Sequence, residues 1–322
     1  MRKNTSWFAT LLILAGIVGA PNARAAQPTE GHIAAPDGVK LFYRSLGQGD
    51  DVVLLPGGMY LFDDFKRLAV GRRLIAYDQR NRGRSDAVQE RSKLERGVVQ
   101  DAEDLDVVRR HVGAERVAVI AHSYMGLAAA LYAVNDPERV SRIVQIGPPP
   151  PVYGARYEPD TNSTDPTLKE VFAKLASVQA QGAGMAPEEL CARAWEVLRP
   201  MYVAKREDAG KLRSWGGCDL PNERNAMQHF NTNILPSMKR LTFAPEQLAK
   251  VAMPVLTIHG TKDRNAPYGG GREWAASLPN ARLLTITDAA HAPWVEAPEV
   301  VFGAIERFLK GEWPRDAQRI SP

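Results

Sequence analysis

From about residue 32 onward, the chain alternates short apolar runs with segments that are apolar on one side only. The apolar runs are rich in Val, Ile and Leu, and they predict the strands of a buried sheet. Six such runs are Asp51–Leu55, Arg73–Tyr77, Val117–Ala121, Ile143–Ile146, Val255–Ile258 and Leu283–Ile286. Two further runs, Ile33–Ala35 and Lys40–Arg44, flank Asp37-Gly38, a dipeptide typical of a hairpin turn.

The segments between these runs have the spacing of helices. In the segment 100–112, Leu105, Val108 and Val112 lie three or four positions apart, and charged residues occupy the other positions. The last helical segment is Val300–Leu309. Strand–helix alternation with continuously apolar strands is typical of a mostly parallel sheet with helices on both faces. The sequence therefore predicts an α/β fold.

The alternation stops between about Pro148 and Leu248. This stretch contains helical segments and no convincing strand; the helical segments are Leu168–Gln179, Pro187–Leu198 and Asn225–Asn233. An insertion between two core strands lies over the carboxyl ends of the strands, where α/β sheets bind ligands. We therefore expect a helical cap, residues 148–248, inserted after the sixth core strand of a core formed by residues 26–147 and 249–322. A separate domain unrelated to the site is the alternative.

The first 25 residues have the pattern of a cleavable signal peptide. Arg2 and Lys3 precede the apolar run Phe8–Ala20, and Ala23-Arg24-Ala25 fits the small-x-small cleavage motif. The apolar run is shorter than the roughly 20 residues that span a bilayer, although an uncleaved membrane anchor is the alternative. We expect a secreted or periplasmic protein with no stable membrane insertion after processing.

Processing also changes the charge. Loss of Arg2, Lys3 and Arg24 lowers the formal net charge from +4 to +1, so composition gives no reason to expect a nucleic-acid partner. The two cysteines, Cys191 and Cys218, have neither a C-x-x-C nor a metal-ligand spacing. An oxidising compartment permits a disulfide between them. The spacing leaves open whether they are bridged or are separate buried thiols.

The strongest chemical signal is a serine at the end of a predicted strand. The run Val117–Ala121 leads through His122 into Ser123 and then into a helix, and a tight strand-to-helix turn exposes the serine Oγ. Asp263 and His291 each follow a later predicted strand. In this arrangement the histidine acts as the general base, and the aspartate fixes its tautomer and stabilises its charged form. We predict that Ser123, Asp263 and His291 form a catalytic triad.

Three other residues compete for these roles. His122 should point away from its neighbour Ser123, and His259 lies too early in its loop to serve as the base. Asp288 is so close to His291 that we expect it to close the local turn.

Acyl transfer also needs two backbone donors for the developing oxyanion. One donor is expected to be the N–H of Tyr124, which follows the serine. The other is expected from Gly58 or Met59, because Pro56-Gly57-Gly58 ends a strand and glycine permits close approach of the backbone. An ordinary turn at these glycines is the alternative.

These motifs resemble those of capped α/β hydrolases over about residues 32–310. The segment Asp78–Ser85 reads Asp-Gln-Arg-Asn-Arg-Gly-Arg-Ser and resembles the Asp-Gln-Arg-Gly-x-Gly-x-Ser loop of proline-iminopeptidase-like hydrolases; we expect it to brace the site from behind. Leu55-Pro56-Gly57-Gly58 resembles the oxyanion strand end of the same branch. The resemblance implies a hydrolase that uses no cofactor and no metal.

The chain departs from the family pattern in three places. The serine turn usually reads Gly-x-Ser-x-Gly, but Ala121 and Met125 take the glycine positions, so we expect the helix start to shift slightly. Leu55 stands where a histidine usually precedes the Pro-Gly-Gly. Proline-specific relatives carry a cap glutamate shortly before a His-aromatic pair; here the pair is His229-Phe230, and Glu223 is the nearest acid.

Together these observations favour a secreted serine hydrolase that cleaves a small carboxylic ester through an acyl-serine intermediate. An aminopeptidase that releases an N-terminal residue from a short peptide is the alternative, and it would use Glu223 to bind the substrate ammonium. A lyase or lactone-cleaving relative, and a non-catalytic binding protein on the same scaffold, remain open. The sequence does not indicate the oligomeric state.

Overall fold

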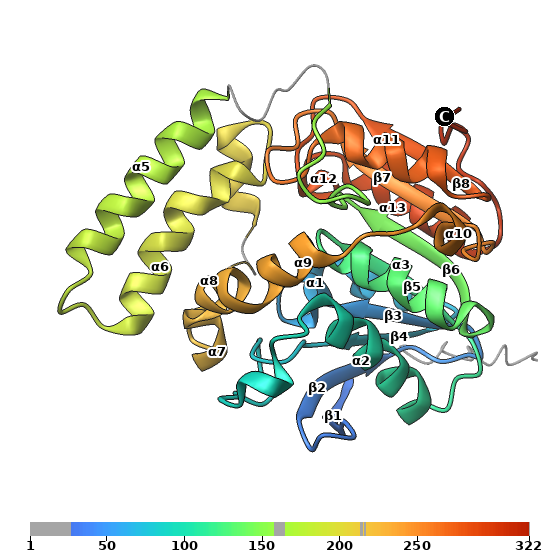
Figure 1. The fold of residues 1–322 in the computed structure, drawn as a ribbon, viewed down its shortest axis with the longest axis horizontal. Helices are drawn as coiled ribbons and strands as arrows, with labels where there is room; N and C mark the ends of the chain where they lie inside the picture. The colour runs from blue at the N-terminus through green and yellow to red at the C-terminus, as the bar shows by residue number, and fades with distance from the viewer. Residues whose placement is uncertain (1–26, 158–164, 213–214, 216, 322) are drawn as a thin grey trace, which may run out of the picture.

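The computed structural model describes residues 27–157, 165–212, 215 and 217–321 (Figure 1). The predicted signal peptide lies outside these residues. Within the described part of the chain, no helix is long and apolar enough to cross a membrane.

The core is an eight-stranded sheet with the order β1-β2-β4-β3-β5-β6-β7-β8. The strands are β1 Thr29–Ala34, β2 Lys40–Leu46, β3 Val52–Pro56, β4 Arg73–Tyr77, β5 Val117–His122, β6 Val140–Ile146, β7 Val255–Gly260 and β8 Ala281–Ile286. β2 pairs antiparallel with β1 and β4, and every other neighbouring pair is parallel. The mostly parallel α/β sheet predicted from the apolar runs is confirmed.

Helices cover both faces of the sheet. The core helices are α1 Gly58–Phe65, α2 Val98–His111, α3 Met125–Asn135, α10 Pro245–Leu248, α11 Tyr268–Ser277, α12 Pro293–Glu296 and α13 Pro298–Leu309. Alternate residues of a strand point to opposite faces. In β5, Val119 packs in the cluster that includes α2, α3 and α11, whereas Ile120 packs in the cluster that includes α1 and α13. The strands are therefore buried on both sides, which explains their continuous apolar runs.

The remaining helices lie between β6 and β7 in the chain. The longer or central ones are α5 Pro166–Gln181, α6 Pro187–Leu198, α7 Pro221–Arg224, α8 Ala226–His229, a π-helix Phe230–Ile234 and α9 Leu235–Arg240, and two short 3-10 helices, Arg199–Met201 and Arg206–Lys211, lie between α6 and α7. Figure 1 shows α5 and α6 side by side, projecting beyond the sheet, with α7, α8 and α9 nearer to the core. The helical insertion is thus present after the sixth strand, as predicted.

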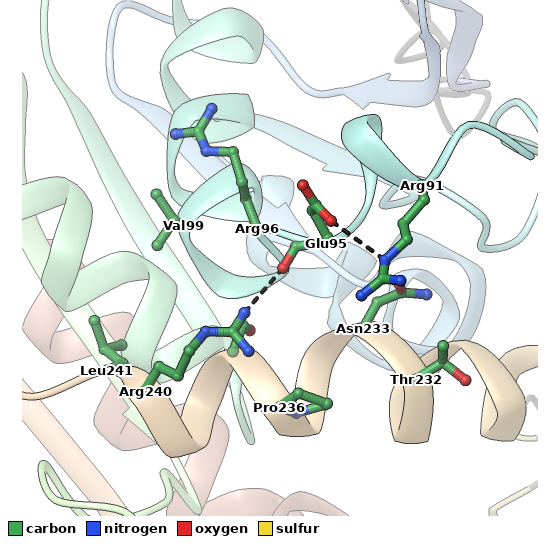
Figure 2. A pocket seen from close by; sticks show the side chains of 10 residues that line it. Arg91, Glu95, Arg96, Val99, Thr232, Asn233, Pro236, Arg240 and Leu241 are labelled. Atoms are coloured by element: carbon green, nitrogen blue, oxygen red, sulfur yellow. Dashed lines mark hydrogen bonds and ion pairs between the residues drawn. The ribbon is translucent and has the colours of Figure 1, made fainter.

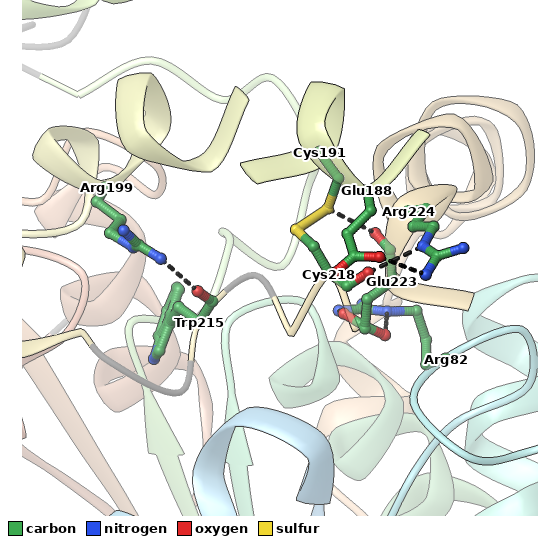
Figure 3. The surroundings of a disulfide bond; sticks show 8 residues. All are labelled: Arg82, Glu188, Cys191, Arg199, Trp215, Cys218, Glu223 and Arg224. Carbon is green, nitrogen blue, oxygen red and sulfur yellow. Dashed lines mark hydrogen bonds and ion pairs between the residues drawn. A yellow bond between two sulfur atoms is a disulfide. The ribbon is translucent and has the colours of Figure 1, made fainter. Parts of the chain in front are cut away.

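A disulfide joins two parts of this insertion. Cys191 lies on α6 and Cys218 lies just before α7, and their sulfur atoms are 2.01 Å apart (Figure 3). The bond therefore ties α6 to the segment that leads into α7 and to Glu223. The pairing that the sequence left open is formed in the structure.

The sheet order determines where a ligand can bind. The connection from β3 runs to β4 on one side, and the later strand β5 lies on the other side of β3. Ligands of open α/β sheets bind beyond the carboxyl ends of strands at this kind of switch point. Gly58 follows β3 and Ser123 follows β5, so both predicted site segments leave the sheet at this position.

Candidate active site

Ser123 lies on a strained turn between β5 and α3. Its φ angle is 57°, in the left-handed region that residues other than glycine rarely adopt. The Ser123 N–H donates to Ile146 O at 2.9 Å, which anchors the turn to the neighbouring strand β6. Strain of this kind persists where the surrounding structure fixes the backbone, and it is frequent at functional sites.

The helix after Ser123 accommodates Met125 without a glycine at that position. α3 begins at Met125, whose side chain is fully buried. The close approach occurs one residue later, because a Cβ on Gly126 would lie 2.9 Å from Pro148 Cβ, closer than packed carbon atoms approach. The close contact with Pro148 is therefore made at Gly126, one position after the usual glycine of the serine turn.

His291 and Asp263 form a buried hydrogen-bonded pair. His291 Nδ1 lies 2.8 Å from Asp263 Oδ2, and the two residues are 1% and 2% exposed. Asp263 Oδ1 accepts from the backbone N–H groups of Asn265 and Ala266. Burial alone would raise the pKa of Asp263, but the two histidines beside it, His291 and His259, outweigh burial and hold this pKa well below its usual range. The carboxylate is thus kept charged where it can orient an imidazole.

The two other histidines near this pair have separate partners. His259 Nε2 lies 3.2 Å from Asp263 Oδ2 and 3.1 Å from Ala266 O, so it is a second neighbour of the aspartate. His122 Nε2 lies 3.0 Å from His291 O, and Tyr60 Oη lies 3.1 Å from His122 Nδ1. Burial lowers the pKa of His122 well below its usual range, and the neighbouring His291 acts in the same direction, so His122 stays neutral. Its ring fixes the backbone of His291 rather than serving Ser123.

Several contacts bring the Ser123 turn and the His291–Asp263 pair together. The rings of His122 and His291 have centroids 4.6 Å apart, and His122 directly precedes Ser123. Gly147 follows Ile146, the acceptor of the Ser123 N–H, and a Cβ at Gly147 would lie 3.0 Å from both Asp263 Oδ2 and His291 Nδ1. Ser123 Oγ makes no hydrogen bond with a described residue. Catalytic hydrogen bonds of this type often tighten only when substrate is bound.

Three backbone N–H groups at this end of the sheet have no backbone acceptor among the described residues: those of Gly58, Met59 and Tyr124. Gly58 and Met59 start α1 after Gly57, whose φ of 89° turns the chain out of β3. Tyr124 directly precedes α3. The first N–H groups of a helix have no partner within the helix and favour negative charge. These N–H groups therefore lie at the starts of α1 and α3 without a backbone acceptor among the described residues.

Glu223 is engaged by an arginine of the core. Arg82 Nε and Nη2 donate to the two carboxylate oxygens of Glu223, each at 2.9 Å, and the Gly83 N–H donates to Glu223 Oε1 at 2.8 Å (Figure 3). Glu223 is 4% exposed. Burial would raise the pKa of Glu223, but the Arg82 charge and these hydrogen bonds outweigh it and lower this pKa. Glu223 therefore already has a cationic partner within the chain.

The loop around Arg82 also braces the site. Asp78 Oδ2 accepts from the Arg84 N–H at 2.9 Å, and Ser85 Oγ donates to Asp78 O at 2.7 Å. Arg80 makes a buried bidentate pair with Asp104 of α2. These bonds explain the repeated Asp, Arg and Ser residues of this segment. The sequence indicated this bracing, but it did not indicate that Arg82 turns toward the cap.

Aromatic rings lie against His291 and its neighbour His122. Tyr202 lies between α6 and α7, and its ring centroid is 5.6 Å from that of His291. Trp215 lies 4.9 Å from the Tyr60 ring and 5.6 Å from the His122 ring, centroid to centroid. The sequence pattern did not indicate these contacts, because Tyr60 lies on α1, Tyr202 and Trp215 lie outside the α-helices and strands, and only the tertiary fold brings the three together.

Two surface grooves lie apart from these residues. The larger, of about 800 Å³, runs between the segment 91–99 and α9, and its arginines already have partners (Figure 2). Arg91 pairs with Glu95, Arg240 donates to Glu95 O, and Arg96 pairs with Glu103. The smaller is lined by Asn81, Asn222 and His229, among others. Neither groove is lined by Ser123, Asp263, His291 or Arg82. No group of three or more potential metal-ligating side chains occurs among the described residues.

Comparison with known proteins identifies the family. The family model of the α/β hydrolase fold matches residues 55–298. The chain belongs to the α/β hydrolase family. This hydrolase is 28% identical over 297 residues to a non-heme chloroperoxidase of Streptomyces lividans, a match that covers 87% of this chain and 99% of the relative.

Two further relatives are named for different activities. A bifunctional esterase/perhydrolase of Acinetobacter calcoaceticus is 27% identical to the hydrolase. This match covers 84% of the hydrolase and 96% of the relative. A proline iminopeptidase of Heyndrickxia coagulans is 25% identical, with coverages of 87% and 98%. Among solved structures, an esterase from Exiguobacterium antarcticum aligns with a TM-score of 0.67 at 18% identity, covering 88% of the hydrolase and all of that chain. This last likeness shows the fold alone.

Proposed function

We propose that this hydrolase cleaves carboxylic esters through an acyl-serine intermediate, with Ser123 as nucleophile, His291 as base and Asp263 as its partner. The observation that carries the proposal is the buried His291–Asp263 hydrogen bond of 2.8 Å beside the strained Ser123 turn. Serine needs an adjacent base to attack a carbonyl, and the base needs a third group to orient it.

In the proposed reaction, Ser123 Oγ attacks the ester carbonyl carbon while His291 Nε2 takes the hydroxyl proton. The resulting oxyanion binds the N–H groups of Tyr124 and of Gly58 or Met59, each donor of this kind being worth roughly 3 to 4 kcal/mol. The bond to the alcohol oxygen breaks as His291 returns the proton to it. Water then attacks the acyl carbon while His291 takes a proton from it. The bond from the acyl carbon to Ser123 Oγ breaks as His291 returns this proton to Oγ, which releases the acid and regenerates Ser123.

The aminopeptidase alternative has support from the proline iminopeptidase relative. It requires a cap carboxylate that is free to bind a substrate ammonium. Glu223 already accepts three hydrogen bonds from Arg82 and Gly83, so we rank ester cleavage first.

Hydrolysis rates for nitrophenyl esters of increasing chain length, measured beside proline and alanine nitroanilides, test this ranking. The proposal predicts turnover of the esters and little turnover of either anilide. Faster cleavage of proline nitroanilide than of every ester would contradict it.

We also propose that the hydrolase is exported and loses residues 1–25. The Cys191–Cys218 bond supports this proposal, because disulfides persist in oxidising compartments and are rare in the cytosol. Mass measurement of the protein isolated from each cell fraction tests it. The expected form begins at residue 26 and lies outside the cytoplasm; a full-length cytoplasmic form would contradict export.

A further inference from the structure

Arg82 has unused donors beside the candidate site. A guanidinium carries five N–H donors, and Glu223 takes one from Nε and one from Nη2. Nη1 makes no hydrogen bond with a described residue, and the side chain keeps 14% of its surface exposed. Arg82 lines neither of the two surface grooves described above.

The loop that carries Arg82 packs beside the Ser123 turn. A Cβ on Gly83, the next residue, would lie 2.9 Å from Met59 Cβ at the start of α1. Gln79 Nε2 of the same loop donates to Tyr124 Oη at 3.4 Å, and Tyr124 follows Ser123. The Arg82 charge also opposes the rise that burial causes in the pKa of Tyr124. Arg82 therefore lies on a segment in contact with both sides of the candidate site.

We propose that Arg82 binds a carboxylate carried by the ester substrate, using Nη1 and the remaining N–H of Nη2 as a donor pair. This inference rests on the proposed ester hydrolysis. Arginine presents parallel donors that match the two oxygens of a carboxylate, and a guanidinium keeps its charge at every physiological pH. The substrate class is thus a monoester with a free carboxylate elsewhere in the molecule.

Glu223 positions this guanidinium. It holds the Nε edge of Arg82 and is itself held by the Gly83 N–H, while the Cys191–Cys218 bond ties α6 to the segment just before α7 (Figure 3). With one edge fixed, the other edge can point in one direction only. The aminopeptidase alternative expected from the sequence would use Glu223 to bind a positively charged ammonium. In this arrangement Glu223 instead holds Arg82, which would bind a negatively charged carboxylate.

The test compares esters that differ only in a terminal carboxylate. Monomethyl adipate is compared with methyl hexanoate for a carboxylate on the acyl side, and 4-acetoxybutanoate with butyl acetate for one on the alcohol side. We expect one of the two carboxylate esters to have a kcat/KM about 10- to 100-fold above that of its neutral match, mainly through a lower KM. Ratios near one in both pairs, with the neutral esters turned over, would overturn the inference.

Variants of Arg82 and Glu223 distinguish two roles for Arg82: binding a substrate carboxylate, and holding the cap against the core through Glu223. Arg82→Gln alone leaves Glu223 buried without its partner, so the informative pair is Glu223→Gln and the double variant Arg82→Gln/Glu223→Gln, which keeps a neutral hydrogen-bonding pair. We expect the ratio of kcat/KM for the carboxylate ester to kcat/KM for its neutral match to be at least tenfold lower in the double variant than in Glu223→Gln. Equal ratios would overturn the inference. Arg84→Gln is the matched control, since Arg84 is exposed on the same loop and should leave the ratio unchanged.

A binding measurement keeps this inference distinct from the proposed reaction. Ser123→Ala should bind monomethyl adipate, and adding Arg82→Gln/Glu223→Gln to it should weaken that binding at least tenfold in calorimetry. This result would support the subsite even if no ester were cleaved. Equal binding by both forms would reject the subsite whatever the activity on neutral esters.

Discussion

Asp263 and Glu223 are two buried carboxylates beside the same site, and they differ in their partners. Asp263 faces His291 and His259, whereas Glu223 faces Arg82 and the Gly83 N–H. In both, burial would raise the pKa and the partner lowers it instead. An imidazole can take up and release a proton under physiological conditions, but a guanidinium cannot. The first pair therefore suits proton transfer, and the second suits anchoring and charge recognition.

Removing the proposed nucleophile should have the largest effect. We expect Ser123→Ala to lower kcat for nitrophenyl esters by at least about four orders of magnitude while substrate binding is nearly retained. Steady-state kinetics with a circular dichroism control for folding measures this. Retention of more than a tenth of the activity would contradict the role given to Ser123.

Matched changes of the two carboxylates to amides test the comparison itself. Asp263→Asn should lower kcat on a neutral nitrophenyl ester by about three to four orders of magnitude, because the imidazole loses its orienting charge. Glu223→Gln should lower it by less than about tenfold, because Glu223 takes no proton from the reacting groups. Similar losses of kcat in the two variants would contradict the assignment of proton transfer to the Asp263 pair and of charge recognition to the Glu223 pair.

The disulfide of the cap should affect stability more than chemistry. Replacing Cys191 and Cys218 together by serine frees a closed loop with a sequence separation of 27 residues. The free energy of unfolding should fall by up to about 3.5 kcal/mol in the chain-entropy model. Denaturant unfolding of the double serine variant measures this, with the reduced native protein as a second comparison. An unchanged midpoint would mean that the bond constrains nothing in the unfolded chain.

Asp101 sharpens the comparison, because it is a buried carboxylate whose Oδ2 has no hydrogen-bond partner among the described residues. Burial and the nearby Asp104 raise the pKa of Asp101 to about 8. The folded protein then holds a proton that the unfolded chain releases near pH 4, so stability falls as pH rises from about 4 to 8.

The change Asp101→Asn removes this titration and keeps a donor. The free energy of unfolding of the variant, minus that of the native protein, should therefore increase as pH rises from 5 to 8, by on the order of 1 kcal/mol per pH unit. Thermal unfolding across this range measures the difference. A difference that stays constant with pH would contradict the protonated state of Asp101.

The sequence predicted the sheet well because its strands are buried on both faces and read as continuous apolar runs. It predicted where Ser123, Asp263 and His291 leave the sheet, because Ser123 directly follows β5 and the other two lie in the loops after β7 and β8. It did not predict the partner of Glu223, since Arg82 lies 141 positions away and the two meet only when α7 packs on the core. Charged residues in short cap helices carry no periodicity that indicates such a contact.

The identity of the residue that reacts with a fluorophosphonate probe tests the central claim most directly. After labelling, digestion and mass spectrometry, the account predicts one adduct, on Ser123, whose formation is strongly slowed by His291→Ala and absent in Ser123→Ala. An adduct on another residue, or a folded protein that leaves Ser123 unlabelled, would contradict the proposed nucleophile and the reaction built on it.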